Sequence, residues 1–283
     1  MSNKKEKVII PEYINSPLNN PMANYAVYIP GKFESLLVKL ISFFAGGFVG
    51  IIFYGGLFKS DGLATTATYI SNVFFFALTG IVGAKFLYPM YINRCLGKRK
   101  NKLKKQFRDM LESLASSFSS GSNVQSAFEN ALEDLKMQYD SGEMIVREME
   151  EIVAGSKQNI EIPVMIRSFG ERSGNEDIVS FADVFEVCYR KGGNMNSVIH
   201  RTNSVISDKM AIADEIETKL TSNKMQHNIM SVMPIVVVAM LKFTNDAFAE
   251  NFATPTGVAV NTAAIVIFLL AYKYGLKIVD IKE

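Results

Sequence analysis

The chain has 283 residues, of which 48% are hydrophobic, and it contains 20 Phe, no Trp, 2 Cys and 2 His. Two cysteines exclude a disulfide scaffold and a Cys-rich metal site, and two histidines leave little for a zinc enzyme or a His-based triad. The formal net charge of +2 is a cancellation of +11 over residues 1–108, −10 over residues 109–220 and +1 over residues 221–283. This segregation indicates that different parts of the chain face different surroundings.

Four long segments contain no Asp, Glu, Lys or Arg and are rich in apolar side chains: 40–58, 62–84, 225–241 and 251–272. About 20 helical residues cross a hydrocarbon core roughly 30 Å thick, so we predict four transmembrane helices arranged as two hairpins. Pro234 lies in the third segment and should kink that helix by removing a backbone hydrogen bond. The alternative is a soluble protein whose buried helices are unusually long and apolar.

Lys and Arg flank these segments unevenly. They are concentrated before the first segment, after the second, where Arg94–Arg108 has eight cations and no acid, and after the fourth. The positive-inside rule therefore predicts that both termini and the long middle segment are cytoplasmic. The predicted parts are a cytoplasmic N-terminal tail (1–35), transmembrane hairpin 1 (36–93), a cytoplasmic helical domain (94–224), transmembrane hairpin 2 (225–277) and a cytoplasmic C-terminal tail (278–283).

The middle segment has apolar residues at helical spacing and no alternation long enough to predict a strand. Its expected helices are Leu103–Phe118, Val124–Leu135, Met144–Ala154, Ile162–Phe169, Ile178–Tyr189 and a long helix from about Met195 into the third apolar segment. We expect a capping box at Ser122 and Gln125, and a helix end at Gly170. The fold class is therefore all-α.

Two glycine turns in this segment resemble each other. Gly121–Phe128 (GSNVQSAF) lies 71 residues before Gly192–Ile199 (GGNMNSVI), and in each an Asn follows two positions after the first glycine. Glycine adopts the left-handed conformation that ends a helix without a Cβ clash. Gly121, Gly192 and Gly193 are therefore expected to be structural turns, unless the similarity over eight positions arose by chance.

The stretches LASSFSSGSNVQSAFENALEDL (Leu114–Leu135) and FADVFEVCYRKGGNMNSVIHRTNSVISDKM (Phe181–Met210), with the span that contains Pro234, resemble the type II secretion system F domain. One such domain between two hairpins is similar to the TadB/TadC-like platform proteins of tight-adherence pili. The resemblance covers about residues 103–241. It implies an antiparallel cytoplasmic bundle in a non-enzymatic inner-membrane (cell membrane) protein, with three kinds of protein partner: a secretion or pilus ATPase, a second platform subunit or copy, and a pilin-like substrate.

The sequence contains no candidate catalytic, cofactor-binding or metal-binding residues. The nearest approach to a phosphate-binding loop, Gly80-Ile-Val-Gly83-Ala-Lys85, has the wrong spacing and lies within a span. Glu148, Glu150 and Glu151 are interpreted as a solvated helix face. A transporter would need polar groups near the bilayer midplane, where the spans offer mainly Asn72 and Asn261, and a membrane-tethered signalling protein would need an output motif. Both remain alternatives.

The charge pattern also predicts a partner surface. The basic run has limited aromatic interleaving, so we expect no nucleic-acid partner and interpret the run as a topology signal and lipid-headgroup anchor, with partner docking as the alternative. The residues predicted to contribute to docking are a basic collar (Lys98, Arg99, Lys104, Lys105) and an acidic face (Glu129, Glu133, Asp134, Glu148, Glu151).

Overall fold

The computed structural model describes residues 11–58 and 65–279, and the chain divides into two compact units. The first unit contains the residues up to Ile29 together with Ile92–Ile212, and the second contains Pro30–Tyr91 together with the residues from Ala213 onward. The flanking lysines at positions 4, 5, 7, 59 and 282, and the start of the second apolar segment at residue 62, lie outside the described residues.

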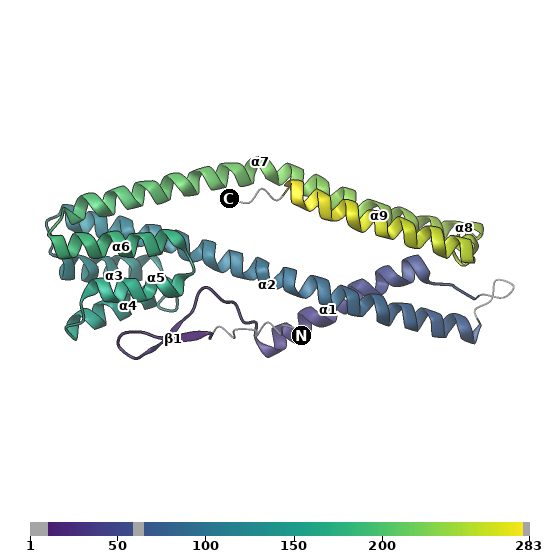
Figure 1. The fold of residues 1–283 in the computed structure, drawn as a ribbon, viewed down its shortest axis with the longest axis horizontal. Coiled ribbons are helices and arrows are strands. Elements are labelled where there is room, and N and C mark those ends of the chain that lie inside the picture. The colour runs from purple at the N-terminus through teal and green to yellow at the C-terminus, as the bar shows by residue number, and fades with distance from the viewer. Residues whose placement is uncertain (1–10, 59–64, 280–283) are drawn as a thin grey trace, which may run out of the picture. The chain divides into compact units, whose positions relative to one another are not determined.

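Helices make up most of the described chain (Figure 1). The elements are β1 (Tyr13–Asn15), β2 (Pro21–Ala23), α1 (Lys32–Tyr54), α2 (Thr66–Ser119), α3 (Val124–Gln138), α4 (Met144–Lys157), α5 (Ile162–Ser173), α6 (Glu176–Lys191), α7 (Met195–Thr244), α8 (Asp246–Phe252) and α9 (Pro255–Val279). The expectation of a largely helical chain is confirmed. The predicted N-terminal tail, however, contains the antiparallel hairpin β1–β2.

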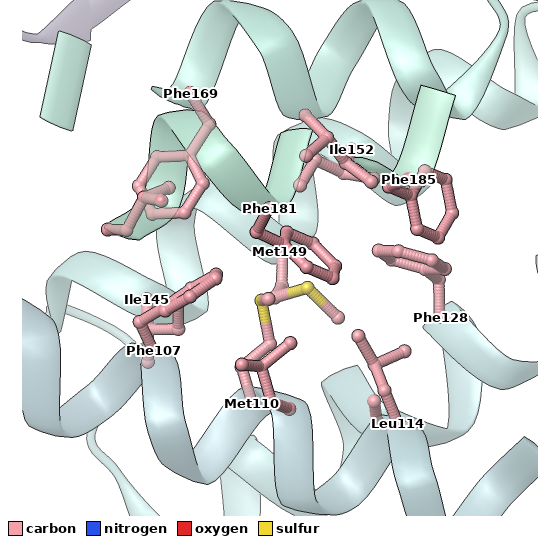
Figure 2. Packing of buried hydrophobic residues seen from close by; sticks show 14 of the residues in the cluster. Phe107, Met110, Leu114, Phe128, Ile145, Met149, Ile152, Phe169, Phe181 and Phe185 are labelled. Atoms are coloured by element: carbon pink, nitrogen blue, oxygen red, sulfur yellow. The ribbon is translucent and has the colours of Figure 1, made fainter. Parts of the chain in front are cut away.

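The first unit is a helical bundle in which α3 packs on α4, α4 on α5 and α5 on α6. Its apolar core is rich in phenylalanine, and Figure 2 shows Phe107, Met110 and Leu114 of α2 facing Phe181 and Phe185 of α6. The rings of Phe107 and Phe181 are in edge contact, with centroids 5.4 Å apart. The apolar residues at helical spacing over Leu103–Ala115 are the buried face of α2.

The ends of the bundle helices follow from local side-chain chemistry. Asn123, rather than the expected Ser122, caps α3, because its side chain accepts a hydrogen bond from the backbone N–H of Ser126 at 2.8 Å. Gly121 and Gly192 have φ of +85° and +66°, which confirms left-handed turns at both positions. The predicted helix end at Gly170 is wrong. Helix α5 continues to Ser173 and ends at the left-handed Gly174.

In the second unit, α1 packs against the first part of α2 through glycines. A Cβ on Gly46 would lie 2.6 Å from the backbone oxygen of Thr79, and a Cβ on Gly80 would lie 2.7 Å from the Phe43 ring. Further along the pair, the hydroxyls of Ser35 and Tyr88 are 3.1 Å apart, and the Tyr91 hydroxyl donates to Glu34 at 2.8 Å. The glycines of the first apolar segment thus allow close helix contact within the chain.

By length and composition, three helices of the described chain could cross a membrane: Lys32–Tyr54, Thr66–Ser119 and Pro255–Gly275. Their apolar side chains are largely exposed; Phe86, for example, is 78% accessible. The third predicted segment corresponds to Asn228–Thr244, a shorter apolar part of α7 in which Pro234 lies within the helix. Exposed apolar helices of this length are typical of a membrane protein.

Candidate interaction surface

A buried ion pair lies inside the bundle, where the sequence had suggested a solvated face. Arg172 of α5 donates to both carboxylate oxygens of Glu148 on α4, at 2.7 Å each, and the two side chains are 3% and 1% exposed. The expectation that Glu148 belongs to a solvated acidic face is therefore wrong. Because its side chain is buried, Glu148 cannot contact a partner at the surface.

Tyr25 of the N-terminal segment completes this buried cluster. Its hydroxyl donates to Glu148 at 2.8 Å, and its ring makes an edge contact with Phe169, with centroids 6.5 Å apart. Burial and then the neighbouring Glu148 carboxylate raise the pKa of the Tyr25 phenol well above its usual range, so the phenol stays protonated as a donor. Burial also raises the pKa of Glu148, and the Arg172 guanidinium opposes this effect.

Polar contacts hold the rest of the N-terminal segment, residues 11–29, against the bundle. Glu151, a predicted docking residue, accepts hydrogen bonds from the hydroxyl of Ser16 and from the amide of Asn20, the latter at 3.1 and 3.2 Å. The Arg99 guanidinium donates to the backbone oxygen of Val27 at 2.9 Å and lies 5.2 Å from the centroid of the Tyr25 ring. Arg99 and Glu151 therefore have a structural role within the chain.

The basic collar divides into engaged and accessible residues. Lys104 is 3.3 Å from Asp177, which Lys209 also contacts at 2.5 Å. Partial burial acts to raise the pKa of Asp177, but the hydrogen bonds from Lys209 and Lys104 outweigh it and hold the pKa below its usual range. Lys98 and Lys105 are exposed and form no ion pair within residues 11–58 and 65–279.

The acidic face divides in the same way. Glu129 of α3 is 3.6 Å from Lys157 of α4, across the contact between these helices. Glu133 is exposed and Asp134 is half-buried, and neither forms an ion pair with another described residue. Of the five predicted acidic residues, these two form neither an ion pair nor a contact with the N-terminal segment among the described residues.

Asp134 also lines an open groove between α2 and α3 of about 370 Å³, whose other lining residues are Asp109, Glu112, Ser113, Ser116 and Gln138. Asp109 accepts hydrogen bonds from Arg108, at 2.8 and 3.0 Å, and from the hydroxyl of Tyr139. The groove thus presents the carboxylates of Asp134 and the exposed Glu112 to solvent, whereas Asp109 is engaged by Arg108 and Tyr139. Among the described residues, no group of three or more His, Cys, Asp and Glu side chains is arranged to hold a metal ion.

The polar residues of the apolar unit make contacts between helices. Asn261 of α9 is 7% exposed and donates to the backbone oxygen of Phe53 at 2.9 Å, while Asn72 accepts from the backbone N–H of Gly56 at 3.0 Å. Lys242 of α7 donates to the backbone oxygens of Ile52 and Gly55 at 3.0 and 2.9 Å. These contacts satisfy backbone groups near the end of α1, which is a packing role.

Comparison of the chain with known protein families, with curated proteins and with solved structures found no match.

The buried cluster of Tyr25, Glu148 and Arg172 was not predicted from the sequence. Arg172 lies in a polar stretch of residues that was expected to follow a helix, and Tyr25 lies in a segment that was expected to be a tail. One signal was present: Glu148 falls within the apolar positions Ile145, Met149 and Ile152 of α4, and a carboxylate on that face requires a cationic partner.

Proposed function

We propose that this chain is a multi-pass inner-membrane platform protein of a tight-adherence-type pilus or a type II secretion-like machine. In this role it couples a cytoplasmic ATPase to the assembly of a pilin-like substrate, beside a second F-domain subunit or another copy of itself. The observation that carries the proposal is the separate helical bundle encoded between apolar helices of membrane-spanning length. The resemblance of Leu114–Leu135 and Phe181–Met210 to the F domain supplies the type of machine.

The proposed topology has four spans and places both termini and the bundle in the cytoplasm. The third of these spans in chain order is Asn228–Thr244, which has 17 residues and begins within α7. The excess of Lys and Arg after the second apolar segment supports a cytoplasmic bundle. The variants Lys98→Cys and Glu250→Cys test this orientation. Each is labelled on intact cells with a membrane-impermeant maleimide. Labelling from outside the cell is expected at residue 250 and not at residue 98.

The proposed ATPase surface is reduced to the residues that the structure leaves accessible. These are Glu133 and Asp134 of the acidic face, with Glu112 of the groove that Asp134 lines, and Lys98 and Lys105 of the basic collar. Exposed charges of this kind govern association rate and partner choice more than the stability of the fold. Their reversal should therefore affect docking without unfolding the bundle.

Co-purification with the secretion ATPase of the same organism tests the function. The variant Glu133→Lys/Asp134→Lys and the variant Lys98→Glu/Lys105→Glu should each lose ATPase binding at least tenfold. The control is Glu171→Lys, an exposed acid of α5 outside both patches, which should bind like the wild type. Equal ATPase recovery with all three variants would refute the proposed surface, and no recovery with the wild type would refute the proposed coupling role.

A further inference from the structure

The N-terminal segment contacts the bundle as a peptide ligand contacts its receptor. One aromatic side chain, Tyr25, is buried to 2% exposure, and its polar end has a dedicated acceptor in Glu148. Leu18 and Ala23 are only partly buried against the core. A single fully desolvated aromatic anchor among weaker contacts is the usual distribution of energy in a peptide complex.

Backbone hydrogen bonds accompany the anchor on both sides. The N–H of Tyr25 donates to the backbone oxygen of Arg172 at 2.8 Å, and Nη1 of Arg172 donates to the backbone oxygen of Ala23 at 3.3 Å. Arg99 adds its contact with the backbone oxygen of Val27 at 2.9 Å. These contacts are made to the backbone of the segment. They therefore place few constraints on the side chains that flank Tyr25.

The receptor side does not depend on the segment for its charge balance. Glu148 is already bound by two hydrogen bonds from Arg172, so loss of the Tyr25 hydroxyl leaves neither charge without its partner. Departure of the segment would also expose the ion pair to water, which reduces the desolvation cost of holding it in the interior. The strands β1 and β2 pair with each other, so the hairpin does not extend a sheet of the bundle.

We infer that the bundle carries a binding site for a peptide with a tyrosine anchor, formed by Phe169, Arg172, Glu148 and Arg99, and that residues 11–29 occupy it reversibly as an intramolecular ligand. The occupant is this segment of the chain itself. The inference is independent of the proposed coupling role, because it rests on contacts within the first unit alone.

A peptide-binding experiment on the full-length protein tests the site. A fluorescent peptide of residues 11–29 is added to detergent-solubilised wild type and to the Tyr25→Ala variant, and binding is measured by anisotropy. A tethered segment has an effective concentration in the millimolar range, so the wild type should not bind micromolar peptide. In the variant, loss of the anchor weakens the binding of the internal segment to the site about 100-fold. The wild-type peptide should therefore bind to the variant.

Two control peptides separate anchor recognition from nonspecific adsorption. The peptide with Tyr25→Ala should lose binding about 100-fold, and the peptide with Tyr25→Phe about tenfold, because it lacks only the hydrogen bond to a charged acceptor. Binding of all three peptides with one affinity, or of none of them to a folded Tyr25→Ala protein, would overturn the inference.

Hydrogen exchange on the wild type provides a test that does not require the variant to fold. The amides of Asn24 and Tyr25, which donate to the backbone of Glu12 and Arg172, should exchange at least tenfold faster than the amides of Leu111 and Phe181 in the core. Exchange of both sets at the same rate, with the same dependence on denaturant, would show that the segment opens only with global unfolding and would overturn the inference.

Discussion

Gly46 of α1 and Gly83 of α2 approach so closely that a Cβ on Gly46 would lie 3.0 Å from the Cα of Gly83, and a Cβ on Gly83 would lie 2.9 Å from the Cα of Gly46. A backbone atom cannot move aside as a flexible side chain can. The variant Gly46→Ala should therefore destabilise the packing of α1 on α2 by about 1–3 kcal/mol.

Gly97 of α2 provides a matched control, because a Cβ there meets no atom within 4 Å. Gly97→Ala should stabilise the helix by about 0.5–1 kcal/mol, through the lower conformational entropy of the unfolded chain. The measurement is unfolding in detergent followed by circular dichroism. Equal effects of the two alanines would contradict the close packing of α1 on α2.

The buried pair predicts an asymmetry between single and double substitutions. Arg172→Met leaves a carboxylate in the interior without its cation, which should cost about 3–5 kcal/mol. The double variant Glu148→Leu/Arg172→Met removes both charges and should recover a large part of this loss. Urea unfolding of the three proteins measures the difference, and a double variant less stable than Arg172→Met would count against this account.

Acid should weaken the bundle in part through Glu143. Hydrogen bonds from Lys102 and Gln106, at 2.8 and 2.7 Å, hold the pKa of Glu143 below its ordinary value of 4.5. A lowered folded-state pKa stabilises the fold above the unfolded-state value, and this contribution disappears as the pH falls through the folded-state pKa. The variant Glu143→Gln should therefore lose less stability than the wild type when the melting temperature is compared at pH 6 and at successively lower pH below 4.5.

Lys242 should contribute to the packing of α7 against the end of α1. Lys242→Met removes two charge-assisted hydrogen bonds to backbone oxygens, which should cost about 1–3 kcal/mol. Lys273→Met, at an exposed position of α9, is the control and should change stability by less than about 0.5 kcal/mol. Thermal unfolding in detergent distinguishes the two variants, and equal stability of both would contradict the role of Lys242.

Much of the fold could be predicted because it depends on periodic burial and on glycine turns. The spacing of Phe107, Met110 and Leu114 predicted their shared buried face, and Gly121 and Gly192 predicted the left-handed turns. Helix ends were less predictable. Gly170 looked like a terminator, but it is buried where α5 meets α6, and a Cβ there would lie 3.4 Å from the Cα of Val179.

The interaction surface could be predicted only in part, because the sequence does not show which charges neutralise each other across the fold. Lys104 and Asp177 are separated by 73 positions and pair through packing that no local pattern records. Glu148 and Arg172 belong to different helices, so a carboxylate that looked solvated is at the centre of the bundle. Glu133 matches the expectation of an accessible acid because it is exposed on α3, and Asp134 is half-buried but lines an open groove.

The contact between Tyr25 and Glu148 joins residues that are 123 positions apart, so the order of synthesis separates them in time. At a translation rate of roughly 5–20 residues per second, Glu148 is made roughly 6–25 seconds after Tyr25. Contacts between successive bundle helices close much shorter loops and can form as each helix emerges. The N-terminal segment, although made first, therefore cannot dock until α4 and α5 have been made, and during that interval a newly made chain presents its tyrosine anchor without a receptor.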